Sequence, residues 1–271
     1  MSSFPTGDQN IDAWLLAKLP QEDFLQVLTL NKATSKMRNR DYIWFNRFIA
    51  SYGQESFENV KTTMKRSWKD FCLLIIKYLK SSNYNKAMKL AAQGGHRDLV
   101  NFFISKGAED WDWAMEGAAQ GGHRDLVDFF ISKGAREWNW GMHGAAQGGH
   151  RDLVDFFISK GANDWDFGMR GAAQGGHRDL VDLFISKGAR YWNSGMEGAA
   201  QGGHRDLVDF FISKGADNWN WGIRGATQGG HPDLVNFFIS KGANNWNSAM
   251  RGAAIGGHRE LVDYFKSMKS Q

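Results

Sequence analysis

The sequence predicts an all-α protein in which a small helical domain is followed by a helical solenoid of seven short helix-turn-helix repeats. Three observations predict this fold. A histidine recurs every 27 residues from residue 96 to residue 258. The chain has 32 glycines and only three prolines, and the glycines follow the same period. Apolar residues within each period keep helical spacing. Self-similarity at a fixed period of this length is the signature of a repeat architecture.

The chain divides into three predicted parts. Residues 1–10 are expected to form a flexible N-terminus, residues 11–83 a small helical domain, and residues 84–271 the seven repeats. Within the helical domain, four stretches place apolar residues at the spacing of an amphipathic helix. These stretches are residues 11–19, 24–30, 41–49 and 67–79.

Two rows of residues mark the repeats. The histidine row consists of His96, His123, His150, His177, His204, His231 and His258. The tryptophan row has the same spacing, begins with Tyr84 and continues as Trp111, Trp138, Trp165, Trp192, Trp219 and Trp246. We expect the row tryptophans to lie in the core between repeats, with a binding stripe as the alternative.

Each repeat is predicted to hold two short helices, called A and B. In residues 138–162, Asn139 follows the row tryptophan and is expected to be the N-cap of helix A, because its side chain can accept from a free backbone N–H. Gly148 and Gly149 end helix A, since glycine adopts the left-handed conformation at low cost. In the sixth repeat Pro232 opens helix B, where its missing N–H leaves no bond unmade.

Two short helices gain stability only when neighbouring repeats cover both of their faces. The end repeats should therefore be atypical, and Leu90 replaces a recurrent glycine while Lys266 replaces a recurrent isoleucine. An arginine row opens most B helices, and an acidic residue follows each arginine, so this row is interpreted as a charge-balanced, solvated face. The row is Arg97, Arg124, Arg151, Arg178, Arg205 and Arg259.

Charge and composition exclude several classes of function. Residues 1–83 hold 12 Lys/Arg and 8 Asp/Glu, whereas residues 84–271 hold 21 of each. Neutral repeats argue against a nucleic-acid partner, which would need a basic face. The longest apolar run, residues 71–76, is far too short to cross a membrane. No basic-then-apolar segment opens the sequence, so we expect no signal peptide. We therefore expect a cytoplasmic protein without a membrane partner. The single cysteine, Cys72, is expected to be buried and inert.

The histidine row does not predict a metal site. Stacked helices lie about 8–10 Å apart, too far for equivalent imidazoles to share an ion with bonds near ~2 Å. We interpret each row histidine as a turn residue that bonds to the loop of its own or the next repeat. No nucleophile with a base, and no phosphate-binding loop, is recognisable. The sequence therefore predicts no catalytic residue, no cofactor and no enzyme activity.

Positions that vary between repeats are the candidates for binding a partner, with neutral drift at exposed sites as the alternative. They lie at the start of helix A, and aromatic and arginine side chains there are of the types that anchor interfaces. His143 lies outside the histidine row and is expected at the surface. The candidates are Trp113, Glu116, Trp140, His143, Phe167, Arg170, Glu197, Trp221, Arg224 and Arg251.

The repeated string Ala-Ala-Gln-Gly-Gly-His-x-x-Leu-Val-x-Phe-Phe-Ile-x-x-Gly-Ala closely resembles the ankyrin repeat, with its Ala-Ala-x-x-Gly-His turn and its Val-Val-x-Leu-Leu-Leu-x-x-Gly-Ala helix. Ankyrin repeats have 33 residues. The six residues missing here fall where ankyrin builds its β-hairpin, and the Thr-Pro-Leu-His motif is absent. The resemblance implies an ankyrin-like solenoid without long β-hairpin fingers, which binds a target protein on its concave surface. Such 27-residue repeats are similar to ankyrin-like proteins of large DNA viruses, which implies a host–virus interaction in the host-cell cytoplasm.

Residues 11–83 resemble an F-box, a helical module that docks on the adaptor subunit of a cullin-type ubiquitin ligase. The resemblance consists of a Leu-Pro break, an Asp-Phe-Leu helix, a helix with Trp44 and a downstream Ser-Trp-Lys; Leu30-Asn31-Lys32 stands where the family has Val-Cys-Lys. It implies contact through Leu19, Pro20, Phe24, Leu25 and Trp44. The leading hypothesis is therefore a ubiquitin-ligase adaptor that binds a target protein. The alternative is a structural or scaffolding repeat protein, for example in a virion, without a link to ubiquitin.

Overall fold

The computed structural model describes residues 70–72, 74 and 83–269. The chain divides into two units, Met1–Asp110 and Trp111–Gln271. The F-box-like contacts at residues 19, 20, 24, 25 and 44 lie outside the described residues, as does the predicted flexible N-terminus.

The described part of the first unit contains one repeat. Its two helices are α7 (Tyr84–Gln93) and α8 (Arg97–Ser105). Phe71 packs edge-on against Phe102 of α8, with ring centroids 6.1 Å apart. Cys72 is 5% exposed, which confirms the expected burial of this thiol.

The second unit consists of A and B helices in strict alternation. Its A helices are α9 (Trp111–Gln120), α11 (Trp138–Gly148), α13 (Trp165–Gly175), α15 (Trp192–Gly202), α17 (Trp219–Gly229) and α19 (Trp246–Gly256). Its B helices are α10 (Arg124–Lys133), α12 (Arg151–Ser159), α14 (Arg178–Lys187), α16 (Arg205–Ser213), α18 (Pro232–Ser240) and α20 (Arg259–Lys269). Pro232 is the first residue of α18, which confirms the predicted start of helix B.

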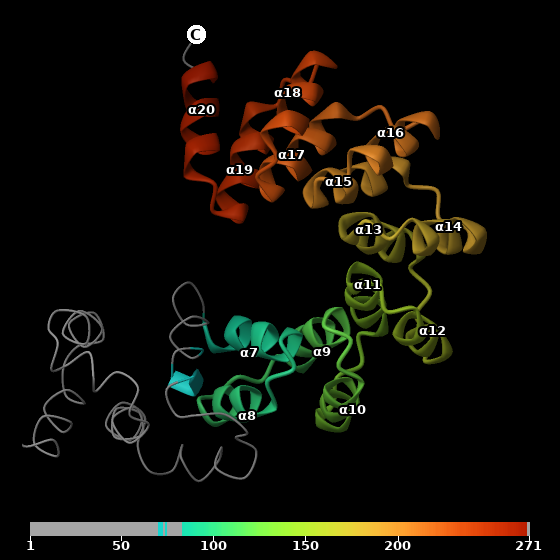
Figure 1. Ribbon diagram of the computed structural model, residues 1–271, viewed down its shortest axis with the longest axis vertical. Coiled ribbons are helices and arrows are strands. Elements are labelled where there is room, and N and C mark those ends of the chain that lie inside the picture. Colours follow the sequence, from blue (N-terminus) through green and yellow to red (C-terminus); the bar gives the residue numbers. More distant parts are fainter. Residues whose placement is uncertain (1–69, 73, 75–82, 270–271) are drawn as a thin grey trace, which may run out of the picture. The chain divides into compact units, whose positions relative to one another are not determined.

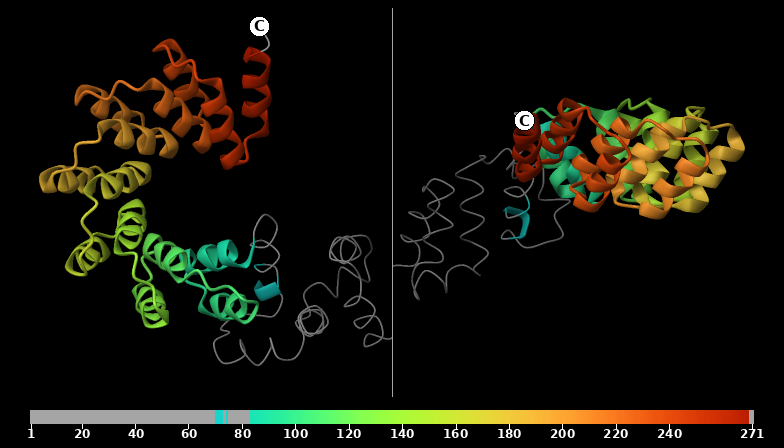
Figure 2. Two further views of the ribbon diagram at one scale, coloured as in Figure 1. Left: turned by 180° about the vertical axis from the view of Figure 1, so that it is seen from behind. Right: turned by 90° about the horizontal axis from the view of Figure 1, so that it is seen from above.

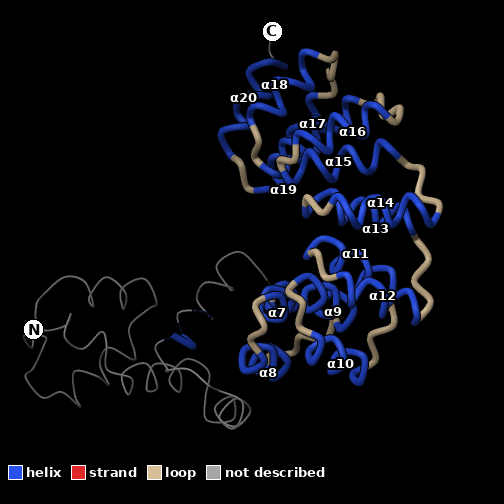
Figure 3. The backbone as a smooth tube through the Cα atoms, turned by 45° about the vertical axis from the view of Figure 1, so that its right-hand side comes forward, coloured by secondary structure: helices blue, strands red, loops and turns tan. Residues whose placement is uncertain are grey.

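Within the second unit the helices form an arc with two rows (Figure 1). The A helices make the inner row, in which each packs against the A helix of the next repeat. The B helices make the outer row, and the view from behind in Figure 2 shows the same order from green α9 to red α20. The described residues form helices and loops without a strand (Figure 3). The prediction of an all-α array of helical repeats is therefore confirmed.

The core repeats with the same period as the sequence. Each B helix buries one phenylalanine completely: Phe130, Phe157, Phe184, Phe211, Phe238 and Phe265. In the second repeat of this unit, Met142, Ala145 and Ala146 of helix A face Leu153 and Val154 of helix B, and all five are fully buried. Burying one such large apolar side chain contributes roughly 1.5–3 kcal/mol.

The row tryptophans are half-buried, so their predicted place in the inter-repeat core was wrong. Each opens its A helix. The rings of Trp165 and Trp246 contact the B helix of their own repeat, whereas those of Trp138 and Trp192 lie 5.8 Å from Arg136 and Arg190 of the preceding loop. Trp246 stacks on Phe265 at 5.7 Å, and Lys187 lies 5.4 Å from the ring of Trp165. The fully buried phenylalanine fills the core, and the half-buried tryptophan lies at the edge of this core.

Glycines at three positions of the A helices allow close packing, counted here with the row tryptophan as position 1; position 4 is alanine in α9 and α19, and positions 7 and 11 are glycine throughout the second unit. At position 4, a Cβ on Gly141 would overlap the ring of Phe157 in its own B helix. At positions 7 and 11, a Cβ on Gly144 or Gly148 would overlap a backbone carbonyl of the preceding A helix. The predicted helix stop is the next residue, Gly149, which has φ 77° and is the C-cap. Positions 7 and 11 therefore set the spacing of the inner row.

Asn139 is not an N-cap, which corrects the prediction for position 2. The N-cap of α11 is Glu137, because the helix begins two residues earlier than expected. Asn139 Oδ1 accepts instead from the backbone N–H groups of Asn163 and Asp164 in the next repeat, at 2.8 and 3.0 Å. Two backbone N–H groups in the loop ahead of the A helix donate to this side chain across the repeat boundary, and their hydrogen-bonding requirement is thereby met.

The same bridge occurs at six positions, with N···O distances between 2.6 and 3.2 Å. The acceptors are Asn85, Asp112, Asn139, Asp166, Asn193 and Asn220. The acceptor is Asp where the first of the two bonded loop residues is Arg136 or Arg190, and Asn in the other four cases. A carboxylate therefore meets a loop that carries a positive charge, and an uncharged amide meets the remaining loops.

Candidate partner-binding surface

The inner surface of the arc consists of the A-helix side chains that point away from the B helices. Position 4 faces the B helix of the same repeat, and positions 7 and 11 face the preceding A helix. In α13 and α19 the row tryptophan at position 1 packs on the B helix of its own repeat. Because an α-helix turns 100° per residue, positions 3 and 10 lie about 200° and 180° around the helix from position 1 and point away from the B helices. Position 6 lies between the inner surface and the next A helix. The variable positions of the sequence are positions 3 and 6, so most of the candidates belong to this surface.

Position 3 carries most of the aromatic side chains of the inner surface. The row is Trp113, Trp140, Phe167, Ser194, Trp221 and Ser248. Trp140 is 42% exposed and Trp221 is 40% exposed, while Trp113 and Phe167 are half-buried. Large aromatic side chains that remain accessible in a helical array are the type that anchors protein interfaces.

Position 6 behaves differently, because three of its side chains are buried. Glu116 and His143 are 9% and 7% exposed, so the expected surface location of His143 was wrong. His143 Nδ1 lies 3.1 Å from Glu116 Oε1, and its ring stacks on Phe167 with centroids 4.1 Å apart. Position 6 projects toward the neighbouring A helix, and both side chains are held between repeats.

Three further position-6 residues form an ion-pair chain across α13, α15 and α17. Glu197 is 2% exposed and lies between Arg170 and Arg224. Arg170 Nη2 is 3.7 Å from Glu197 Oε2, and Arg224 pairs with Glu197 Oε1 through both Nε and Nη2. The guanidinium of Arg224 also lies 5.6 Å from the ring of Trp221. Arg251, the last candidate of the row, is exposed.

A hollow of about 290 Å³ opens on the inner surface between α13 and α17. It lies where the position-3 row has a serine between two aromatic residues. Its lining consists of Asp164, Asp166, Phe167, Arg170, Tyr191, Ser194 and Trp221. Asp164, Asp166, Tyr191 and Ser194 are not among the sequence-predicted binding residues. The interruption of the aromatic row at residue 194 was the signal in the sequence that could have located this hollow.

Two of the row histidines bond to the preceding repeat. His204 Nε2 lies 3.2 Å from the carbonyl oxygen of Gln174, and His231 Nε2 lies 3.1 Å from that of Gln201. The prediction named the loop of the same or the next repeat, and the partner is the end of the preceding A helix. Within the described part of the chain, no group of three or more His, Cys, Asp or Glu side chains could hold a metal ion.

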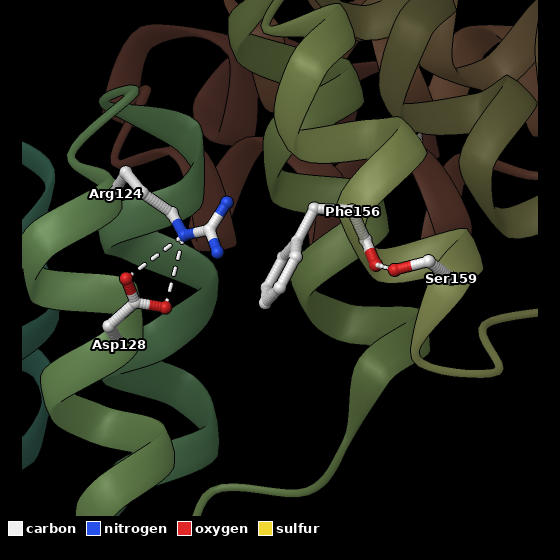
Figure 4. A network of polar contacts seen from close by, with 4 residues as sticks. All are labelled: Arg124, Asp128, Phe156 and Ser159. Carbon is white, nitrogen blue, oxygen red and sulfur yellow. Dashed lines mark hydrogen bonds and ion pairs between the residues drawn. The ribbon is translucent and has the colours of Figure 1, made fainter.

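The arginine row on the outer surface is more than a solvated face. Arg124 Nε donates to Asp128 at 3.0 and 3.1 Å, and its guanidinium lies 3.7 Å from the ring centre of Phe156 in the next B helix (Figure 4). Ser159 Oγ donates to the carbonyl oxygen of Phe156. The acidic partner is four residues along the helix, not adjacent as the sequence interpretation assumed. The row is charge-balanced, and it also joins consecutive B helices.

The fold and this surface define a helical repeat protein whose inner surface carries accessible aromatic rings and inter-repeat ion pairs. In comparisons with known proteins, no protein-family model matches the chain, and no curated protein gives a significant match. None of the helices in residues 70–72, 74 and 83–269 is both long and apolar enough to cross a membrane.

Proposed function

We propose that the protein is an adaptor whose repeats bind a target protein on the inner surface of the A helices. The observation that carries the proposal is the exposure of Trp140 and Trp221 on this surface. The glycines and core residues beneath them are nearly identical from repeat to repeat, whereas positions 3 and 6 differ. A surface that varies on an invariant framework suits a target that is itself not repetitive.

The short loops between repeats support binding by the helices. Only residues 134–137 separate α10 from α11, and Asp112 holds the backbone N–H groups of Arg136 and Glu137. Loops tied down in this way project little, in keeping with an ankyrin-like solenoid that has no long fingers. The inner surface then offers the larger contact area.

The test compares affinity purification of the full chain with that of the double variant Trp140→Ala/Trp221→Ala. Tyr264→Ala is the matched control, since Tyr264 is 43% exposed but belongs to the outer helix α20. A specific target should be recovered by the native chain and by the control, and lost from the double variant. Equal recovery by all three proteins would place binding elsewhere.

The F-box-like region adds a second part to the proposal: residues 11–83 recruit a cullin-type ubiquitin ligase through Leu19, Pro20, Phe24, Leu25 and Trp44. This part rests on the resemblance of the sequence. Leu19→Ala/Phe24→Ala should abolish recovery of the ligase adaptor subunit and leave the target bound. Absence of any ligase subunit from purifications of the native chain would remove this part alone.

A scaffolding function is the second candidate, and the last repeat favours it. Ala146 and Ala173 at position 9 are fully buried, whereas Ala254 at the same position is exposed and Ile255 beside it is 72% exposed. Self-association through this face predicts a discrete oligomer in sizing chromatography. Ile255→Gln, which introduces the residue that other repeats have at this position, should then produce monomers.

A further inference from the structure

The hollow on the inner surface results from one small side chain. Ser194 occupies position 3 of α15, between Phe167 on α13 and Trp221 on α17. Trp140 and Trp221 show that an indole is accommodated at this position in other repeats. The serine leaves a space of about 290 Å³ between the two rings, and Tyr191 stands beside it with 70% of its surface exposed.

Two carboxylates line the same hollow in fixed positions. Asp164 Oδ1 accepts from the backbone N–H of Phe167 at 3.0 Å. Asp166 Oδ1 accepts from the backbone N–H groups of Arg190 and Tyr191, both at 2.7 Å. Because the structural bonds use Oδ1 of each residue, Oδ2 of each is available to a ligand.

The arginines near the hollow are directed elsewhere. Arg170 lines the hollow but is paired with Glu197. Arg190 Nη1 donates to the carbonyl oxygens of Ile185 and Ala189, and its guanidinium lies 5.8 Å from the ring of Trp192. The lining therefore combines aromatic rings with an excess of negative charge.

We infer that this hollow binds an arginine side chain of the target protein; the inference rests on the proposed function and specifies its partner chemistry. A cation is attracted to the face of an aromatic ring. A planar guanidinium can stack against Phe167 or Trp221 and donate to the carboxylates of Asp164 and Asp166. A lysine ammonium has the charge but lacks the planar, forked geometry.

The test selects peptides from a random twelve-residue display library on the full chain and measures their affinity. Selected peptides should carry an essential arginine, and replacing it by citrulline, which has the same shape without the charge, should weaken binding at least tenfold. Ser194→Trp fills the hollow and should cause a similar loss. Ser248→Trp, the same change at position 3 of the last repeat, should alter affinity less than twofold.

A second pair of variants tests the charge. Asp166→Asn keeps the acceptor that other repeats have at position 2, so the bridge to the next loop is retained while the negative charge is lost. It should weaken the arginine peptide at least threefold, whereas Asp112→Asn, the same change outside the hollow, should leave binding unchanged. Circular dichroism confirms that each variant is folded.

The outcomes separate this inference from the proposed function. Peptides that lose binding in Trp140→Ala but contain no essential arginine, or that bind Ser194→Trp normally, would overturn the inference and leave the adaptor function standing. An essential lysine in place of arginine would also overturn it. Failure to select any peptide that depends on the inner surface would count against both.

Discussion

At the scale of single residues, Glu197 shows how a charge can be part of a repeat interface. Its carboxylate is almost fully buried between two arginines from the preceding and the following A helix. A buried charge is tolerated only when it is paired and hydrogen-bonded. One side chain therefore joins three consecutive repeats, and its removal affects two interfaces at once.

Glu197→Ala should lower the free energy of unfolding by about 1–3 kcal/mol. This is less than the full loss for breaking a buried pair, because Arg170 and Arg224 are 28% and 39% exposed and can turn to solvent. Urea unfolding followed by far-UV circular dichroism measures the change. The control Glu137→Ala removes an exposed carboxylate and should change stability by less than about 0.5 kcal/mol. Equal values for the two variants would show that the ion-pair chain contributes nothing.

At the scale of helices, the need for glycine at a packing position depends on whether the atom that a Cβ would contact can move aside. Gly144 faces a backbone carbonyl of the preceding A helix, whereas Gly141 faces the ring of Phe157. Alanine replaces glycine at position 4 in two repeats, as Ala114 and Ala249, but never at positions 7 or 11 of the second unit. A side-chain ring can shift by a small amount, and a carbonyl within a helix cannot.

Gly144→Ala should therefore destabilise the protein by about 2–3 kcal/mol, since overpacking outweighs the better helix propensity of alanine. Gly141→Ala should cost about 1 kcal/mol or less. Both variants are measured by urea unfolding under one set of conditions. The interpretation fails if Gly141→Ala is the more destabilising of the two.

The B helices contain a natural exception that tests their contacts. Arg124, Arg178 and Arg205 each lie within 3.8 Å of the ring centre of a phenylalanine in the next B helix. Arg151 keeps its ion pair with Asp155, but Leu183 stands where the next phenylalanine would be. This junction therefore lacks the aromatic partner that those three junctions have.

Leu183→Phe should stabilise the protein by roughly 0.5–1 kcal/mol, because the ring gives Arg151 a cation–π partner. The melting temperature should rise accordingly. Leu183→Met, a change of similar volume without a ring, is the control and should produce no rise. A rise of equal size in both variants would attribute the gain to packing.

At the scale of the whole second unit, stability should follow the coverage of each repeat by its neighbours. In the last repeat, Ala254 and Ile255 are exposed where interior repeats are covered. Backbone amides of α19 should therefore exchange with deuterium at least tenfold faster than those of α13 and α15, measured by mass spectrometry on native protein. Uniform protection from α9 to α19 would instead indicate one cooperative unit.

The sequence predicted the helical repeats because a period of 27 residues is visible in the chain, and it placed the start of helix B through Pro232. It did not predict the role of Asn139, since the helix begins two residues earlier than expected and Asn139 then bridges to the next repeat instead of capping its own helix. The burial of His143 was missed for a related reason. Spacing along the chain indicates which side chains are equivalent, but not which neighbour each one reaches.

Asp112 and Asp166 bond to loop pairs that contain arginine, and asparagine bonds to the other loop pairs. This has a consequence for how such a chain can be rearranged. Although the repeats look interchangeable, a segment cut at its loop and moved elsewhere would meet an unsuitable acceptor. The transferable module is instead the junction, from the acceptor of one repeat to the loop of the next. Genetic duplication or protein engineering that moves whole junctions would keep each Asp or Asn acceptor matched to the charge of the loop that it bonds.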